Sequence, residues 1–504
     1  MPAALINLPL LVLLIGIGLV AMYVPALHAL TLSSHAEARA FFYSGTLGLM
    51  ILAMVVVALS GRTRARATMH NLLALLGAFA VLPVILAVPF FEALKTTSFL
   101  NAYFEMVSCL PTTGAVLFDP GRLSPTLHLW RAMVGWMGGL LMWVSAVAIL
   151  APLNLGGFEV TATGQPPRHD TGWQQGERAD PQHRVVRAAR MLVPVYAGLT
   201  AVLWICLVIA GDGGLVAFSR AAGVMATSGI TPLAHGAASG SGLWGEVLLA
   251  IFLLFALSRV TFSRDTRVVG TPGVHSDPEF RLGFIIAITV PAVLFLRHWA
   301  GAIEVDSAAN SVSALRALWG GVFTVLSFLT TTGFESSEWE AARDWSGLDT
   351  TGLIFMGLAM VGGGVATTAG GIKLLRVWAL YLSSLREMER LVHPSSIGRA
   401  RANNRRMRRQ GAYIAWLFLM LFALTLAVLI LVLAALGQSF NHATVLAVAG
   451  LSTTGPLIGF APDVPIVLAD IGAAAKLVLC AAMVMGRLET LAVIALALSG
   501  IWRE

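Results

Sequence analysis

Charged residues are scarce in this sequence: Asp, Glu, Lys and Arg together make up 12% of its 504 residues. A soluble globular domain carries about 25%, so the low charge argues against a soluble protein. The hydrophobic residues, 57% of the total, gather in long continuous runs, as membrane-spanning helices require. These runs lack the alternating pattern of membrane β-strands. The composition therefore predicts an all-α polytopic membrane protein, with the lipid bilayer as its first partner.

Cysteine is also rare, and the motifs of enzymes are missing. The three cysteines, Cys109, Cys206 and Cys480, include no CxxC pair, so neither a disulfide framework nor a zinc site is indicated. Neither HExxH nor GxSxG occurs, and these are the motifs that mark a hydrolase. We therefore expect no enzymatic activity. The glycine-rich stretches 45–50 and 211–216 lack the strand–turn–helix context of a nucleotide-binding motif, so any nucleotide control has to come from another subunit.

The few charges are distributed unevenly along the chain. Basic residues gather in short polar segments, among them 61–70 and 401–410, whereas segments such as 335–345 are acidic. This is the positive-inside asymmetry of an inner-membrane protein, and it accounts for the net charge of +7 without a nucleic-acid partner. The basic segment Arg399 to Arg409 suits an anchor at anionic lipid, and docking of a cytosolic partner is the alternative. The N-terminal apolar run has no basic residue before it and is expected to be a retained span.

Short apolar segments, each too short to span a membrane, recur between the long runs. Each ends in a cluster of Thr, Ser and Gly, and the glycines of these clusters follow one another at nearly even intervals of a little over a hundred residues. Each interval contains a long helix, a charged loop, a second long helix and a short re-entrant helix. Such spacing indicates a fourfold internal repeat. The short segments lie near 98–110, 215–227, 315–330 and 440–451.

The repeated cluster has a direct physical interpretation. Irregular backbone inside a bilayer is tolerated only where protein buries it or where it lines a water-filled cavity. A glycine after Thr or Ser lets successive carbonyl oxygens point in one direction, and four such loops around one axis replace the hydration shell of a cation. A half-helix whose C-terminal end faces that centre also favours a cation. Four unrelated extracellular loops are the alternative.

A coupled secondary transporter is the nearest competing class, because its broken helices also bind ions. Fourfold repetition suits one pore better than the twofold inverted repeats of carriers. We therefore expect a single ion pore whose ligands are backbone oxygens, with threonine hydroxyls as auxiliary ligands. The expected ion-binding residues are Thr112, Thr113, Gly114, Thr227, Ser228, Gly229, Thr331, Thr332, Gly333, Thr453, Thr454 and Gly455.

These clusters resemble the filter loops of the Trk/Ktr/HKT superfamily of potassium transporters, and of its TrkH-like branch in particular. The stretches GGGVATTAGGIKLLR (362–376), LREMERLVHPSSI (385–397) and MGRLETL (485–491) carry the same resemblance. The match covers nearly the whole chain. It implies four M1–pore loop–M2 repeats arranged pseudo-fourfold around one ion pore, plus two extra N-terminal transmembrane helices.

The resemblance implies potassium uptake across the bacterial inner membrane, with K⁺ as the transported ion and a homodimer as the working form. It also implies a cytosolic TrkA-like nucleotide-binding regulatory protein as a partner. A sodium-permeable or cation-coupled (symport) member of the same superfamily is the alternative. The implied boundaries are 1–67 for the two N-terminal helices, followed by repeats at 68–175, 176–278, 279–396 and 397–504.

The first cluster departs from the family pattern S-G-x-T-T-T-G. Cys109 and Pro111 stand where that pattern has a glycine and a threonine. Pro111 fixes its φ angle and removes a backbone donor, but it keeps its carbonyl. In the family, a glycine in every filter loop goes with potassium, and a serine in the first loop goes with sodium. All four glycines are present here, so the resemblance favours potassium, and the first loop is expected to be the unusual one.

The stretch 362–376 breaks an apolar run with five glycines. Each glycine in a helix interior costs about 1 kcal/mol, so the break is expected to be functional. It resembles the family's intramembrane loop, which lies below the filter and blocks the pore when closed. A static close-packing site for small residues is the alternative. The expected gating residues are Gly362, Gly363, Gly364, Thr367, Thr368, Gly370, Gly371, Lys373 and Arg487.

Charged residues also occur in the last apolar run. Lys476 and Arg487 are separated by about three helical turns, which places both on nearly the same face, about 16 Å apart. Charges inside a membrane are costly and generally mark a function. One interpretation puts Arg487 in the pore beneath the filter, with Lys476 and Glu489 contributing to the pore electrostatics; a structural ion pair through Glu489 is the alternative. Glu335, after the third cluster, either attracts cations at the outer mouth or is simply solvated.

Overall fold

The computed structural model of the chain describes residues 9–59, 68–153, 157, 181–234, 237, 239–258, 277–301, 310–346, 351–393, 402–462 and 466–489. These residues form helices and no strand, and seven segments among them are long and apolar enough to cross a membrane. The all-α, multi-pass prediction is thereby confirmed. The seven segments correspond to α2 with α3 (Leu10–Ala21, Tyr23–Thr31), α4 (His35–Leu59), α5 (Thr68–Leu94), α7 with η2 (Pro125–Ser145, Ala146–Leu150), α9 (Pro181–Ile209), α12 (Pro278–Gly301) and α17 (Ala402–Ala435).

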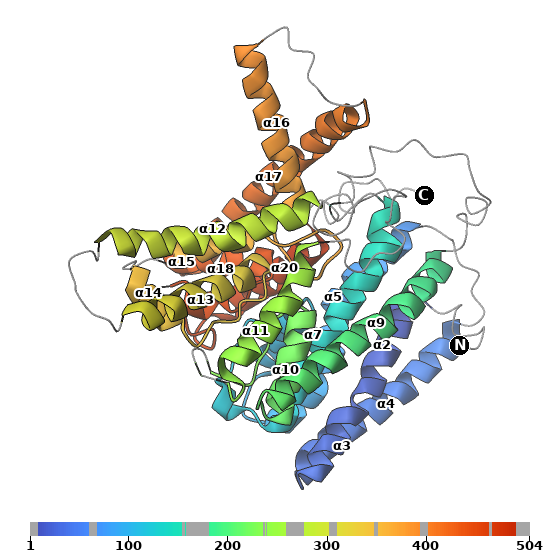
Figure 1. Cartoon of the computed structure of the whole chain (residues 1–504). Helices are drawn as coiled ribbons and strands as arrows, with labels where there is room; N and C mark the ends of the chain where they lie inside the picture. Colours follow the sequence, from blue (N-terminus) through green and yellow to red (C-terminus); the bar gives the residue numbers. More distant parts are fainter. Residues whose placement is uncertain are drawn as a thin grey trace.

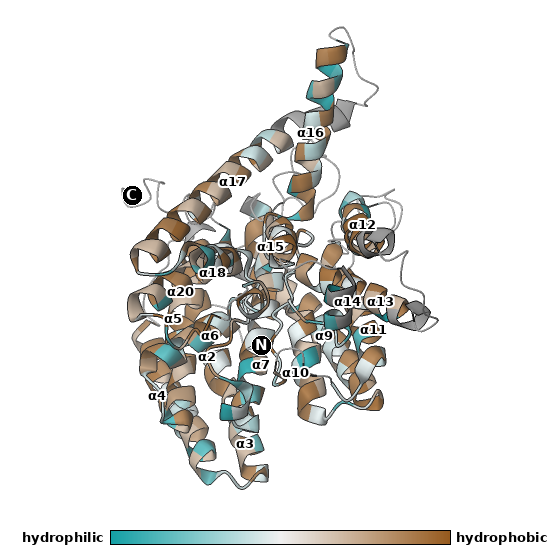
Figure 2. Cartoon of the chain, turned by 90° about the vertical axis from the view of Figure 1, so that its left-hand side faces the viewer, coloured by the Kyte–Doolittle hydropathy of each residue, from teal (hydrophilic) through white to brown (hydrophobic). Residues whose placement is uncertain are grey.

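The outer helices expose apolar side chains over most of their length. Only 6% of the apolar stretch of α4 is buried inside the molecule, and Leu47, Met50, Met54 and Val57 on this helix are exposed. Figure 2 shows hydrophobic residues along the lengths of the outer helices. An apolar surface of this extent is unfavourable in water and favourable against lipid. The outward faces therefore meet the bilayer.

Four shorter helices end in the interior and give the fold its repeat. Each one packs against the long helix that precedes it, which is α5, α9, α12 or α17. The third of them begins earlier than the apolar segment expected at 315–330, because hydropathy marks burial and a helix can continue beyond the buried part. The four half-helices are α6 (Phe99–Cys109), α10 (Gly214–Met225), α13 (Asn310–Leu329) and α18 (Phe440–Ser452).

Each half-helix also packs against the second helix of the preceding repeat. α10 lies on α7, α13 lies on α11, and α18 lies on α15. The first half-helix, α6, lies on α20, which belongs to the last repeat. This contact joins the two ends of the series, so the four repeats form a closed ring. The newly introduced elements are α11 (Gly242–Leu253), α15 (Gly352–Val361) and α20 (Ala473–Leu488).

The N-terminal helices lie outside this ring. α2 packs on α4 and α5, and α3 packs on α4 and α7, which places all three beside the first repeat (Figure 1). At another side, α16 (Leu374–Val392) packs on α17 and extends beyond the other helices (Figure 1). The remaining short elements are η1 (Pro120–Arg122), η3 (Ala151–Leu153), η4 (Leu254–Leu257), α14 (Trp339–Ser346) and α19 (Leu457–Phe460).

Candidate ion pore

Each half-helix ends in the same unusual turn, and a threonine forms it. The φ angles of Thr112, Thr227, Thr331 and Thr453 lie between 48° and 58°. Glycine or asparagine normally takes this left-handed conformation at a helix end, and a β-branched residue adopts it only at a cost in free energy. The same costly choice at four equivalent positions indicates that the side chain of threonine is required there.

The amide after each threonine turns back to the half-helix. It donates a hydrogen bond of 2.8 to 2.9 Å to a carbonyl in the last turn of that helix. Because the N–H and C=O of a trans peptide point in opposite directions, the threonine carbonyl points away from the half-helix. The sequence prediction placed cation ligands at these carbonyls. The four bonds run from Thr113 to Ser108, from Ser228 to Gly223, from Thr332 to Ser327 and from Thr454 to Ala449.

Glycine contacts give the order of the loops around the centre. We number the loops one to four by their glycines, Gly114, Gly229, Gly333 and Gly455. A Cβ added to the glycine of loop one would overlap the carbonyl oxygen of Ser228 in loop two, and one added to the glycine of loop two would overlap the carbonyl oxygen of Thr332 in loop three. The glycine of loop three abuts loop four, whose own glycine abuts loop one. The four loops therefore form a closed ring, and we call the side-chain hydroxyls of Thr112, Thr227, Thr331 and Thr453 the threonine ring.

Loop four, and not loop one, is the unusual member of this ring. Gly114, Gly229 and Gly333 have φ angles of 72°, 62° and 79°, whereas Gly455 does not share the positive φ. Its amide donates a hydrogen bond of 2.6 Å to the carbonyl oxygen of Thr113 in loop one. We expected loop one to be unusual because its sequence has Cys109 and Pro111. These two residues nevertheless leave the shared turn intact.

Buried carboxylates hold the segments that follow loops one and three. Glu105 on α6 pairs with Arg131 on α7 at 2.6 Å and accepts a 3.1 Å hydrogen bond from the amide of Leu117. Glu246 on α11 accepts bonds of 2.7 Å from both the Ser336 hydroxyl and the Ser337 amide. These acidic residues were not singled out from the sequence. An isolated acidic residue in an apolar segment was the signal available, because such a charge requires a partner.

The two residues that follow Glu335 belong to the arrangement around Glu246. Glu335 is only partly exposed and makes an interaction of its own. The next two residues, Ser336 and Ser337, are held by Glu246. The two interpretations of Glu335 at the sequence level therefore both stay predictions.

The glycine-broken stretch 362–373, here called the intramembrane loop, joins α15 to α16 inside the protein. Its two arms lie backbone to backbone: the amide of Ile372 donates to Met360 O at 2.8 Å, and the amide of Lys373 donates to Val361 O at 3.0 Å. A Cβ on Gly362 would overlap Gly370 O. Gly363, Gly364 and Gly371 face further backbone or small side chains in the same way, and Thr367 Oγ1 donates to Gly364 O at 2.7 Å. Close packing thus accounts for most of these glycines.

The tip of the intramembrane loop lies against the threonine ring. The amide of Gly370 donates a 2.7 Å hydrogen bond to Thr331 Oγ1. The hydroxyl of Thr227 donates to Thr368 Oγ1 at 3.0 Å. A Cβ on Gly370 would also overlap Thr453 Oγ1. The loop therefore contacts loops two, three and four at once.

Arg487 on α20 completes these contacts on the side of loop one. Its Nε donates to Pro111 O at 2.5 Å. Its two other nitrogens donate to Thr112 Oγ1 and to Thr368 O. One guanidinium group thus connects loop one to the intramembrane loop, in a position that is 3% exposed.

The other predicted charges take different places. Glu489 pairs with Arg376 at 2.6 Å, and Arg376 also lies over the ring of Phe418 at 3.7 Å. Arg487, Glu489, Lys373 and Thr367 line a small cavity of about 20 Å³ beside the intramembrane loop, and the ammonium of Lys373 donates to Ala369 O.

Lys476 lies near the other end of α20. Its Nζ donates to Asn101 Oδ1 at 2.9 Å and to Ala469 O at 3.0 Å. These partners are near the beginning of α6 and before α20, and none of them belongs to the threonine ring. Lys476 therefore shares a helix with Arg487 but not its surroundings.

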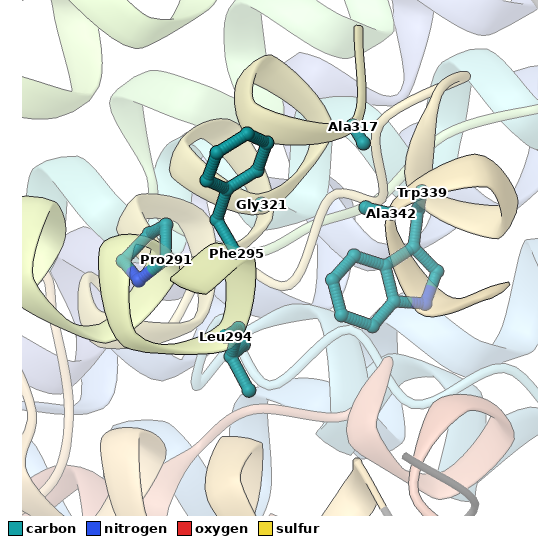
Figure 3. Close-up of a pocket in the computed structure, with 7 residues that line it drawn as sticks. All are labelled: Pro291, Leu294, Phe295, Ala317, Gly321, Trp339 and Ala342. Carbon is teal, nitrogen blue, oxygen red and sulfur yellow. The ribbon is translucent and has the colours of Figure 1, made fainter. Parts of the chain in front are cut away.

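A second cavity lies away from the loops, between α12, α13 and α14 (Figure 3). It has a volume of about 10 Å³, and Pro291, Phe295 and Trp339 are among its lining residues. No carboxylate or hydroxyl lines it, so it offers no side-chain oxygen to a cation. Within the part of the chain described above, no group of three or more His, Cys, Asp or Glu residues is arranged to hold a metal ion. The oxygen-rich site is therefore the one formed by the four loops.

Known proteins resemble this chain in sequence and in fold. A family model described as TrkH, cation transport protein, matches residues 280–501. The Trk system potassium uptake protein TrkH of Salmonella typhimurium is 28% identical over 433 residues, 84% of each chain. TrkI of Halomonas elongata is 28% identical over 443 residues, 85% of this chain and 82% of that one. The crystal structure of the potassium transporter TrkH from Vibrio parahaemolyticus covers 100% of both chains with a TM-score of 0.77 and 25% identity.

Proposed function

Because this chain belongs to the TrkH-like branch of the Trk/Ktr/HKT superfamily and is a multi-pass protein of the bacterial inner membrane, we propose that it takes up potassium through the ring of four loops. The observation that carries the proposal is the repeated turn, which presents one threonine per repeat to a common centre. Backbone carbonyls and hydroxyls arranged in this way replace the hydration shell of a monovalent cation. The proposed ligands are the twelve residues of the four clusters, from Thr112 to Gly114, Thr227 to Gly229, Thr331 to Gly333 and Thr453 to Gly455.

The intramembrane loop is the proposed gate. Its tip touches three of the four loops, and Arg487 connects it to the remaining one. A cation leaving the threonine ring toward the loop meets both the backbone of the loop and a positive charge. The pore in this arrangement is closed, and the loop has to move for ions to pass.

The proposed working assembly is a homodimer with a TrkA-like nucleotide-binding protein on the cytosolic side. The curated relatives are named as parts of a Trk system, and this chain has no nucleotide-binding motif of its own. The proposed units are residues 1–67, the repeats 68–175, 176–278 and 279–396, and the last repeat 397–504. α16, which extends beyond the other helices, is where we expect movements of the partner to reach the gate (Figure 1).

The test is growth of bacteria that lack their own potassium uptake systems, on low potassium, together with uptake of Rb⁺. We expect the chain, expressed with its regulatory subunit, to restore both. Gly333→Ser is the control, because a Cβ at this position meets Pro456 within 3 Å and φ is 79°. The variant should lose uptake while it is still inserted in the membrane. Failure of the unchanged chain to take up Rb⁺, despite expression with its subunit, would contradict the proposal.

One observation favours the sodium-permeable alternative. The carbonyl of Thr113 accepts a hydrogen bond from Gly455, and that of Thr454 accepts one from Leu457, so the four loops do not offer a large cation four equivalent oxygens. Fewer equivalent ligands weaken the preference for K⁺ over Na⁺. Competition of Na⁺ with Rb⁺ uptake distinguishes the two: a potassium transporter keeps its Rb⁺ uptake in excess Na⁺, and a sodium-permeable one loses it.

A further inference from the structure

The intramembrane loop contacts the threonine ring by hydrogen bonds and not by apolar contact alone. Thr331 Oγ1 accepts a 2.7 Å bond from the amide of Gly370. Thr227 Oγ1 bonds the Thr368 hydroxyl at 3.0 Å. Thr112 Oγ1 accepts from Arg487. Two of the four hydroxyls, those of Thr331 and Thr112, thus accept a bond from the loop or from the arginine that holds it, and a third, that of Thr227, donates to the loop.

The fourth hydroxyl, that of Thr453, makes no such bond and is therefore available to a ligand. Thr453 is fully buried, and its Oγ1 has no hydrogen-bond partner within the described part of the chain. A buried hydroxyl without a partner is costly. Gly370 is the neighbour that leaves no room there, since a Cβ on it would overlap both Ser452 O and Thr453 Oγ1. Nothing in the loop replaces the bond that this oxygen is able to make.

A potassium ion needs the same oxygen lone pairs. A cation is bound by lone pairs that point at it, whereas a donated N–H directs a positive hydrogen at them. In the observed arrangement the Gly370 amide occupies one of the two lone pairs of Thr331 Oγ1, and the Arg487 guanidinium occupies one of the two of Thr112 Oγ1. The guanidinium charge also repels a second cation at close range. The seated loop therefore leaves each of these two oxygens one lone pair instead of two and holds a positive charge beside the ring, so the loop and an ion weaken each other's binding there.

We propose that the threonine ring is the innermost cation site of the pore and that the intramembrane loop competes with potassium for it. The transported ion then acts as a ligand that unseats its own gate. Because a ligand shifts a two-state equilibrium by its preference for one state, rising K⁺ increases the fraction of molecules with the loop unseated. By reciprocity, any partner that unseats the loop raises the affinity of the ring for K⁺. The identity of the ion rests on the function proposed above, while the competition rests on the ring and the loop.

The experiment follows the loop itself and does not depend on transport. The full-length protein in nanodiscs is subjected to hydrogen–deuterium exchange in increasing KCl, with choline chloride keeping the ionic strength constant. The amide of Gly370 is protected by its bond to Thr331 while the loop is seated. We expect exchange of the peptide 362–373 to rise with K⁺ and to saturate.

Three substitutions in the loop sharpen the test without changing the ring. Thr368→Val removes the hydroxyl that bonds Thr227 and keeps the size of the side chain; we expect the K⁺ midpoint to fall about fivefold, the equivalent of one hydrogen bond. Thr368→Ser retains the hydroxyl and should keep the midpoint of the unchanged protein. In Gly370→Ala the loop cannot seat, and exchange should be fast without K⁺.

The outcomes separate this inference from the proposed function. Exchange of the loop that is the same from zero to saturating K⁺, and the same in Na⁺, overturns the competition. The competition is also overturned if Thr368→Val and Thr368→Ser need the same K⁺ concentration for half-maximal exchange of the loop. If Na⁺ raises the exchange and K⁺ does not, the competition stands and the assignment of potassium falls. If K⁺ raises the exchange while Rb⁺ uptake fails, the ring binds the ion and the transport proposal falls.

Discussion

Arg487 joins three parts of the candidate pore through one guanidinium group: Pro111, Thr112 and Thr368. A unit charge a few ångströms from a cation costs about 1 to 4 kcal/mol in surroundings between water and a protein surface. We therefore expect Arg487→Ala to raise Rb⁺ flux in proteoliposomes about tenfold. Arg487→Lys keeps the charge and should recover most of the restriction. Lys476→Ala, on the same helix but away from the ring, should leave flux nearly unchanged. Unchanged flux in Arg487→Ala would remove this residue from the mechanism.

Substitution of Thr453 distinguishes a role of this residue in ion binding from a role in folding. Its φ of 54° strains a β-branched residue by about 1 kcal/mol, and glycine adopts this angle without strain. Its hydroxyl has no hydrogen bond to lose within the described residues. Thr453→Gly should therefore melt at the same or a higher temperature than the unchanged protein while its half-saturation for Rb⁺ uptake rises. Thr444→Gly, inside the same helix, should melt lower. A lower melting temperature in Thr453→Gly would mean that the threonine serves the fold.

At the scale of elements, the ion pair of Glu105 and Arg131 ties the first half-helix to α7 and fixes loop one. Both side chains are buried, so removal of one partner leaves an uncompensated charge and costs about 3 to 5 kcal/mol. Glu105→Gln should lower the melting temperature markedly and weaken the selection of Rb⁺ over Na⁺. The matched control is Glu387→Gln, which breaks an exposed pair with Arg390, a change of about 0 to 1 kcal/mol. Equal melting of the two variants would contradict a bracing role for Glu105.

The elements also show what a sequence can and cannot predict. The half-helices and the intramembrane loop were predictable, because Thr-Gly clusters and a run of glycines are local signals. The pairing of Glu489 with Arg376 and the bond from Gly455 to Thr113 were not, since each joins segments far apart in the chain. For the same reason, the sequence pointed to loop one as unusual when the unusual backbone is in loop four. Roles for the individual loop residues stay predictions until ion binding is measured.

For the whole molecule, the decisive feature is the closure of the ring. α18 of the last repeat packs on α15 of the third, and α20 packs on α6 of the first. The last repeat thus supplies both a loop and Arg487 to a site that the other three cannot complete. The arrangement of four loops around one axis was expected from the repeated clusters, but the helix contacts that close the ring were not, because hydrophobic periodicity gives the number of helices and not which ones touch. It implies that the last repeat docks onto a surface formed by the first and third.

We therefore expect the protein to remain functional when the chain is divided into two fragments before the last repeat. Residues 1–396 and 397–504, expressed together, should be recovered as a complex and restore Rb⁺ uptake, whereas 1–396 alone should not.

A matched pair of variants on α15 tests the docking surface. A Cβ on Gly352 would overlap Ala461 O in the last repeat, whereas one on Gly357 meets nothing within 4 Å. Gly352→Leu in the larger piece should abolish both recovery and uptake, and Gly357→Leu should preserve them. Equal behaviour of the two variants would show that the pieces associate through another surface, because only Gly352 lies against the last repeat.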